Sequence, residues 1–439
     1  MSIIQFIKQM KENEITSVDF KNIHLMDGGA TAIADALKTN TSLTELELLN
    51  NEIEYAGFTQ LADALTKNKT LTLLNFRYNN LGDVGASQLA KALETNTSLK
   101  TLDLQYNDIR DAGVTQLAKA LAKNTSLTTL DLSFNEIRNA GATQLAEALK
   151  TETSSLTLLN LSYNGIGDIG ATKLSEALGI NTSLTTLDLT YNGIKHAGAT
   201  ALSEALKTNK SLIHLVLHSN NIGDTGATSI ADALTKNTSL KTLVLSHNQI
   251  KDEGASALAE ALKTNETLKT LVLSSNNITD GGASALAVAL KRNTTLNLLD
   301  LLPNKIKGDC LPLIKAAITF RESLRKITYK ESIRKQANRS HKLFTDSSSG
   351  SGVIVAKNLA GKELPAFANT SQASSLIQGY YHPLTIYCKG IAYTTAFKSK
   401  SKSKKSKSKS KSNPKKKSKK TKSKSKKPKS KSKKPKKFL

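Results

Sequence analysis

Apolar and polar residues repeat along the first two-thirds of the chain with a period of 28 residues. The first half of each unit reads LxxLxLxxNxI, as in residues 99–109, and its alternation of apolar and polar positions predicts a β-strand. The second half reads GAxxLAxAL, as in residues 85–93, and its apolar residues recur with the spacing of one helix face. Each unit is therefore expected to form a strand, a turn and a helix.

A single strand and helix cannot bury both of their apolar faces, so the units are expected to stack. The predicted fold is an α/β leucine-rich-repeat solenoid, or horseshoe, with a parallel inner sheet and outer helices. It should curve, because packed helices need about 8–10 Å each whereas neighbouring strands need about 4.8 Å. The units begin at Ile15, Leu43, Leu71, Leu99, Leu127, Leu156, Leu184, Leu212, Leu240, Leu268 and Leu296, and one of them is a residue longer than the rest.

This 28-residue unit with its GAxxLAxAL helix resembles the ribonuclease-inhibitor class of leucine-rich repeats over residues 15 to 310. The class includes cytosolic ribonuclease inhibitors, the repeat regions of NOD-like receptors, activators of the Ran GTPase and secreted effectors of intracellular bacteria. The resemblance implies a protein partner bound on the concave face. The repeats lack the Cys and Trp of ribonuclease inhibitors and the acidic tail of Ran activators, so free-standing bacterial effectors are the most similar group.

Two polar columns have structural explanations. An Asn follows every strand from Asn79 to Asn304, where a buried amide can satisfy backbone groups of the turn. An Asp such as Asp168 stands two residues before the repeat Gly in most units, where it can cap a helix. The same alignment argues against a dinucleotide-binding site at Gly165, Gly167 and Gly170, which match GxGxxG. Gly170 is the repeat Gly, and the other two glycines complete the match by chance.

Two other columns should face the concave side. The seventh residue after the opening Leu is aromatic in five successive units, and the fourth is often acidic. Aromatic anchors suit a protein partner, and an acidic face favours a basic one over nucleic acid. Duplication of neighbouring repeats, or stabilisation of the sheet by stacked rings, would explain the same pattern. The candidate partner-binding residues are Glu47, Tyr78, Asp103, Tyr106, Asp131, Phe134, Tyr163, Asp188 and Tyr191.

The net charge of +26 belongs to the C-terminus. Residues 398–439 contain 23 Lys and no acidic residue, which leaves only +3 for the rest of the chain. This Lys/Ser-rich segment cannot bury a core and is expected to be disordered. It could contact nucleic acid or anionic lipid nonspecifically, direct the protein to a nucleus or nucleolus, fold back onto the acidic column, or only aid solubility. Its clustered lysines are Lys404, Lys405, Lys415, Lys416, Lys417, Lys419, Lys420, Lys426, Lys427, Lys433, Lys434, Lys436 and Lys437.

The remaining segments frame the repeats. Residues 1–14 are expected to cap the N-terminal end, residues 15–310 to form about eleven repeat units, and residues 311–344 to form a helical C-terminal cap. That last segment could instead be a membrane-surface or calmodulin-type helix. Residues 345–397 read as a linker with an apolar stretch that forms a hairpin or a short recognition element, and residues 398–439 are the tail.

We find no residues for an enzyme or a cofactor. His214, His218 and His247 lie on late strands, but their spacing disfavours a metal site. Arg77, Arg110 and Arg138 show no pattern that would select one as the catalytic residue of a GTPase activator, which remains an alternative function. No signal peptide or membrane span is expected, and the few cysteines fit a reducing compartment. The leading prediction is a monomeric, cytoplasmic protein-binding module; a nucleic-acid-associated protein acting through its tail is the other alternative.

Overall fold

The computed structural model describes residues 2–307, 312, 387–388 and 391–392. The chain divides into two units, Met1–Thr394 and Thr395–Leu439, and all the described residues lie in the first. The predicted C-terminal cap, the basic tail and its lysines fall outside the described residues, apart from Pro312.

One sheet of eleven parallel strands runs through the repeats, with the strands in chain order. The register advances by one unit at each step, so that Asp103 lies beside Asp131 and Asn160 beside Asp188. This confirms the predicted parallel sheet. The strands are β1 Ser17–Asp19, β2 Glu45–Glu47, β3 Leu73–Asn75, β4 Thr101–Asp103, β5 Thr129–Asp131, β6 Leu158–Asn160, β7 Thr186–Asp188, β8 His214–Val216, β9 Thr242–Val244, β10 Thr270–Val272 and β11 Leu298–Asp300.

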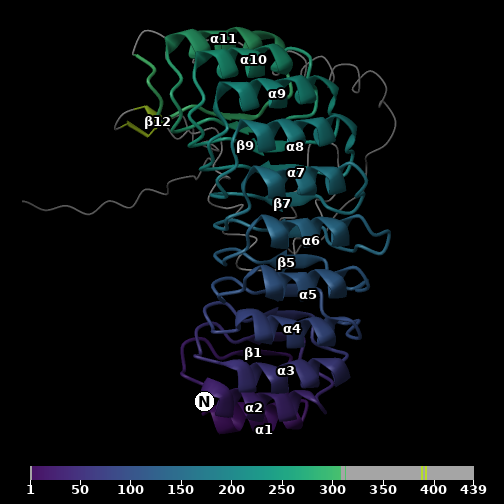
Figure 1. The fold of residues 1–439 in the computed structure, drawn as a ribbon. Helices are drawn as coiled ribbons and strands as arrows, with labels where there is room; N and C mark the ends of the chain where they lie inside the picture. Colours follow the sequence, from purple (N-terminus) through teal and green to yellow (C-terminus); the bar gives the residue numbers. More distant parts are fainter. Residues whose placement is uncertain (1, 308–311, 313–386, 389–390, 393–439) are drawn as a thin grey trace, which may run out of the picture. The chain divides into compact units, whose positions relative to one another are not determined.

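A helix follows every strand from β1 to β10, and consecutive helices pack against one another, as Figure 1 shows. The alternation of strand and helix confirms the predicted solenoid. The helices are α1 Ile3–Lys11, α2 Met26–Leu37, α3 Tyr55–Lys67, α4 Gly82–Leu93, α5 Asp111–Leu121, α6 Asn139–Leu149, α7 Gly167–Leu178, α8 His196–Thr208, α9 Gly223–Lys236, α10 Asp252–Leu262 and α11 Asp280–Arg292.

The N-terminal helix α1 precedes the first repeat and packs against α2. Its side chains cover the end of the core: Met10 is fully buried, and the Phe6 ring meets the Phe20 ring edge-on at 5.5 Å between centroids. Ser2 and Gln5 form a capping box at its first turn.

The core lies between the sheet and the helices. The central residue of each strand from β1 to β10, such as Leu102, is buried among the helix leucines and alanines, for example Leu117 and Ala118. Because side chains alternate along a strand, the first and third residues point away from the helices. We call the surface that they form, on the side of the sheet away from the helices, the helix-free sheet face.

Two columns of buried Asn hold successive units together. Asn135 represents the predicted column: its Nδ2 donates to the Leu104 carbonyl at 3.0 Å, and its Oδ1 accepts from the Ile109 N–H at 3.0 Å, both in the preceding unit. The structural role predicted for this column is confirmed.

The second Asn column contains the N-x-[ST] sequons of the repeat. Asn124 is buried, its Nδ2 donates to the Leu93 carbonyl at 2.7 Å, and its Oδ1 accepts from the Leu127 N–H at 2.8 Å. A glycan on such a nitrogen cannot coexist with this packing. The Asn residues of these sequons therefore form a buried ladder of amide side chains and are not available for glycosylation in the folded chain.

The repeated Asp does act as a helix cap, but on the helix of the next unit. Asp83 Oδ1, in the first turn of α4, accepts from the N–H groups of Arg110 and Gly113 at the start of α5, both at 2.8 Å. The repeat Gly allows this approach, because a Cβ on Gly113 would lie 2.6 Å from that carboxylate oxygen. Each cap therefore links two units.

This Asp sets how the next helix begins. After the units that have it, the N-cap is extended, as at Arg110 and Lys195. Three units have Tyr55, Asn139 or His196 in place of this Asp. The helices that follow them begin instead at a glycine with positive φ, which is Gly82, Gly167 or Gly223, respectively. Sequence differences between units thus come in matched pairs.

Beyond the repeats, β12 Tyr387–Cys388 and β13 Ile391–Ala392 pair in antiparallel fashion. Tyr387 lies opposite Ala392, and Cys388 lies opposite Ile391. This agrees with the hairpin expected in the apolar stretch of residues 345–397.

Candidate interaction surface

The predicted aromatic residues form one continuous stack beside the sheet, which we call the aromatic ladder: Tyr78, Tyr106, Phe134, Tyr163 and Tyr191. Ring centroids of successive members lie 4.1, 4.2, 4.0 and 5.1 Å apart, with interplanar angles of 10–16°. Backbone hydrogen bonds between neighbouring units keep this register, as from the Tyr163 N–H to the Thr190 carbonyl at 2.7 Å. The aromatic row expected from the sequence thus forms a stack of rings in direct contact.

All five ladder residues have a left-handed backbone, with φ between 52° and 54°. The first two units place Asn22 and Asn50 at the same position, also with positive φ. Asn tolerates this region well, whereas an aromatic residue there is strained by about 1 kcal/mol or more. The period-two alternation gave no sign of this conformation, although the two Asn residues in the column are a signal that could have revealed it.

The exposure of the ladder is uneven. Tyr191, Tyr78 and Tyr163 are 59%, 42% and 38% exposed, while Tyr106 and Phe134 are half-buried. Burial, together with a hydrogen bond to the neighbouring Tyr78, raises the pKa of Tyr106 to about 12. The ladder therefore presents ring edges and hydroxyl groups, because most of the ring faces cover one another.

A guanidinium lies beside the first two rings of the ladder. The Arg77 Cζ lies 5.0 Å from the centroid of the Tyr78 ring and 6.0 Å from that of Tyr106, which is within cation–π range. Arg77 is thus occupied by the ladder, and Arg110 by an ion pair with Glu136 at 2.8 Å. Two of the three candidate arginines thus have partners, and a GTPase-activating function stays an untested alternative.

The acidic column makes a turn at the end of the strands. Asp188 Oδ1 accepts from the Thr190 N–H at 2.8 Å, and the same bond is made by Asp131 to the Ser133 N–H and by Asn160 to the Ser162 N–H. Asn and Asp serve equally well in this bond, so the column has a local structural role that requires no charge.

Burial weakens the charge of this column. Asp103 and Asp188 are each only 4% exposed, and Asp131 is half-buried. Burial raises the pKa of Asp188 to about 6 and also raises the pKa of Asp131. Glu47, at the N-terminal end of the column, accepts from Asn75 Nδ2 at 2.7 Å and lies 3.7 Å from Lys21 Nζ. The acidic face is therefore less negative than its sequence suggests.

Later units replace both columns with other side chains. Val244 and Val272 are buried in the position of the acids, and Ser219, His247 and Ser275 keep the positive φ of the aromatic position. The register thus continues through all these units, while the stack of rings ends at Tyr191.

His218 and His247, which follow strands β8 and β9, contact one another, and His218 also binds nearby hydroxyl groups; His214 lies within β8. The rings of His218 and His247 meet edge-on at 5.0 Å, and both nitrogens of His218 have hydroxyl partners: Nδ1 with Ser246 Oγ at 2.6 Å and Nε2 with Ser219 Oγ at 2.9 Å. Burial and the nearby His247 lower the pKa of His218. Among the described residues, no three His, Cys, Asp or Glu side chains are grouped to hold a metal ion.

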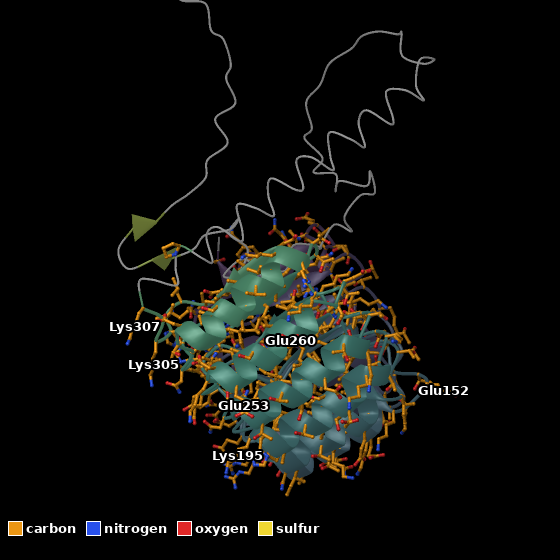
Figure 2. All side chains as sticks on the ribbon, turned by 90° about the horizontal axis from the view of Figure 1, so that it is seen from above. Glu152, Lys195, Glu253, Glu260, Lys305 and Lys307 are labelled. Atoms are coloured by element: carbon orange, nitrogen blue, oxygen red, sulfur yellow. The ribbon has the colours of Figure 1, made fainter. Side chains whose placement is uncertain are left out.

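Exposed cations occupy the loops that lead into the helices. Arg138 and Lys195 are the N-cap residues of α6 and α8, and Figure 2 shows Lys195, Lys305 and Lys307 extending from the ribbon. The Asp that caps each of these helices accepts from the backbone N–H of the cationic N-cap residue and not from its side chain; Asp168 Oδ1, for example, lies 2.7 Å from the Lys195 nitrogen.

In the part of the chain that the structure describes, no helix is long and apolar enough to span a membrane.

Several solved structures resemble the chain. Actin-binding site 2 of leiomodin-1 is 20% identical, over 38% of this chain and 96% of that one, with a TM-score of 0.32. TLR13, solved in complex with ssRNA13, is 20% identical over 69% of this chain and 38% of that one, with a TM-score of 0.42. The leucine-rich repeat domain of APL1B is 18% identical over 69% of this chain and 74% of that one, with a TM-score of 0.39. The chain matches no curated protein.

A family model supplies the assignment, since the model of the MHP1/HER1/GIP3 LRR domain matches residues 1–304. That match covers well over half of the chain and spans all the strands and helices of the repeats. It confirms the predicted leucine-rich repeats, whereas the closer resemblance to ribonuclease inhibitors and bacterial effectors stays a prediction. The chain belongs to the MHP1/HER1/GIP3 LRR domain family, whose repeat architecture is that of a protein–protein interaction module.

Proposed function

We propose that this protein is a non-enzymatic binding module that holds a protein partner on the helix-free sheet face, with the aromatic ladder as the principal contact. The observation that carries the proposal is the ladder itself: five stacked rings at a strained backbone position, of which three are exposed. A ring pair contributes about 0.5–1.5 kcal/mol beyond the burial of its apolar area, which is comparable to the strain of one left-handed aromatic residue. Ring stacking by itself therefore gives little reason to keep aromatic residues at these positions.

The ladder suits a protein better than a nucleic acid. Base stacking needs free ring faces, and here the faces of the inner rings cover one another at 4.0–4.2 Å. Tyrosine edges and hydroxyl groups combine apolar area with hydrogen bonding at low entropic cost, as in many protein interfaces. The buried acids add only a weak attraction for a basic partner, so partner charge is secondary in this proposal.

The test is capture of partner proteins by the full chain. The ladder variant carries Tyr106→Ser and Tyr163→Ser, and the matched control carries Val84→Ser and Ile169→Ser, two exposed apolar residues in the first turns of α4 and α7. Lysate is treated with nuclease, and thermal unfolding shows that each variant is folded. The proposal expects partners that bind the wild type and the control at least tenfold better than the ladder variant. Equal capture by all three chains would contradict it.

The tail supports a second, separate role in polyanion contact. Its 23 lysines without a single acid would neutralise several phosphates at once, so binding should fall steeply as salt rises. Heparin or duplex RNA should bind the full chain with a strong salt dependence, and replacing the clustered lysines by Ser should abolish it. If heparin or RNA still bound equally well after that replacement, the repeats and not the tail would be the polyanion-binding part of the chain. The cytoplasmic or nuclear location stays a prediction.

A further inference from the structure

The aromatic ladder stops at Tyr191, although its backbone continues. Ser219 occupies the next position with φ 51°, and His247 occupies the one after it with φ 55°. The Tyr191 N–H donates to the His218 carbonyl and the Ser219 N–H to the Ser246 carbonyl, both at 2.9 Å. One rung is therefore missing between two rings, while the frame that would carry it is intact.

The gap has the width of one aromatic ring. Neighbouring parallel strands lie about 4.8 Å apart, so the rungs on the two sides of Ser219 are about 10 Å apart. Native rings of this ladder stack at 4.0–5.1 Å between centroids. A single ring inserted at Ser219 would thus continue the stack at its normal spacing.

The wall of this gap is the most exposed ring of the ladder. Tyr191 is 59% exposed, more than Tyr78 at 42%, which also contacts Arg77. Its spacing to Tyr163, at 5.1 Å, is also the widest in the stack. The last ring of the ladder is therefore its most accessible one.

The floor of the gap is already hydrogen-bonded. His218 uses both ring nitrogens on the hydroxyl groups of Ser246 and Ser219, and His247 meets its ring edge-on. An incoming side chain would therefore meet ring surfaces, because the polar atoms of His218 already have partners.

We propose that the gap at Ser219, between Tyr191 and His247, is a slot that receives one aromatic side chain of the partner protein. The inserted ring completes the ladder and supplies the central anchor of the interface. This proposal rests on the proposed function, because it names the chemistry of the partner at one point of the same surface. Arginine and aliphatic anchors are the alternatives that the test distinguishes.

The chain contains no Trp, so the fluorescence of a Trp peptide reports on binding without background. The probe is the pentapeptide acetyl-Gly-Gly-Trp-Gly-Gly-amide, titrated with the full chain, beside peptides with Leu or Arg at the central position followed by nuclear magnetic resonance. We expect saturable binding of the Trp peptide in the millimolar range, and at least fivefold weaker binding of the other two. Equal or tighter binding of the Arg or Leu peptide would overturn the assignment to an aromatic side chain.

Filling the slot is the decisive variant. Ser219→Tyr should place a ring against Tyr191 and weaken Trp-peptide binding at least tenfold. Ser275→Tyr is the matched control, because Ser275 shares the column and the positive φ but lies beyond His247. It should leave binding unchanged. If S219Y binds the peptide as wild type does, the slot is wrong, while the capture experiment with the Tyr106 and Tyr163 variant still decides the proposed function by itself.

Discussion

Asp168 Oδ1 accepts a hydrogen bond from the N–H of Gly198 at 2.9 Å, which joins α7 of one repeat unit to α8 of the next. The same oxygen accepts from the Lys195 N–H at 2.7 Å. One carboxylate thus caps a helix to which it does not belong, and the bond forms only when two units are stacked. In a solenoid this places part of each helix's stability in the interface between units.

Replacing this carboxylate should weaken that interface. Asp168→Ala leaves two N–H groups at the start of α8 without their acceptor, and caps of this kind contribute about 1–2 kcal/mol. We expect a loss of that size in the free energy of unfolding, measured by urea denaturation, and faster amide exchange at the start of α8.

The control for this prediction is Asn139→Ala. Asn139 holds the same position in α6, but the following helix α7 begins at Gly167 with positive φ and needs no carboxylate from it. This variant should change stability by less than about 0.5 kcal/mol. Equal losses in both variants would show that the cap between units has no special role.

The left-handed backbone of the ladder predicts an unusual order of two substitutions. At Phe134, where φ is 52°, Gly is free of the steric strain that Ala would keep. Phe134→Gly should therefore be more stable than Phe134→Ala by up to about 1 kcal/mol. Both lose the same two ring contacts, so their difference isolates the backbone.

The opposite order is expected on the neighbouring strand. Thr129 lies in β5 with ordinary strand geometry, where Gly costs about 0.5–1 kcal/mol relative to Ala. The Thr129→Ala variant should therefore have a higher midpoint of thermal unfolding than the Thr129→Gly variant. If Ala were also the better residue at position 134, the strain assigned to the ladder would be refuted.

The repeat fold followed directly from the sequence, because burial imposes its period on the leucines. The ladder of Tyr78, Tyr106 and Phe134 followed as well, since identical register brings equivalent residues together. What the period could not give was conformation within a unit: the positive φ of the ladder, or the reach of Asp83 into the next helix. These depend on contacts between units, for which one unit's sequence holds only indirect signs.

The acidic column shows the same limit. Its sequence suggested a charged surface, yet Asp188 is buried and serves a turn that Asn160 makes just as well in the unit before. Electrostatic character depends on burial, and alternation alone says which face a side chain takes but not how far that face is covered. The position of this column was therefore predicted and its charge was not, while its role in binding a partner stays a prediction.

The buried Asn of the sequons should be essential for stability. Asn124→Ala would leave the carbonyl of Leu93 and the N–H of Leu127 without partners in the core, at a cost of about 2–4 kcal/mol. Thr125→Ala, at the exposed neighbouring residue, should cost less than about 0.5 kcal/mol. Calorimetric unfolding of the two variants checks this; similar midpoints would mean that the Asn ladder is dispensable.

The raised pKa of Asp188 predicts how stability depends on pH. An unfolded Asp titrates near 3.8, and this carboxyl in the folded chain titrates near 6, so the folded state binds more protons between these values. The stability that protonation of this group contributes is complete below about pH 3.8 and is lost as the pH rises through about 6. The charged form is thus the destabilising one at neutral pH.

Asp188→Asn removes that charge and keeps the acceptor, because the amide oxygen can still accept from the Thr190 N–H as Asn160 does from Ser162. The variant should be more stable than wild type at pH 7.5, on the order of 2 kcal/mol, and the gain should shrink as the pH falls to 5. Asp19→Asn is the control, since Asp19 makes the same turn bond to Lys21 while exposed. Urea unfolding across this pH range decides the matter: a gain at position 188 that does not vary with pH would place its cause in packing and not in the buried charge.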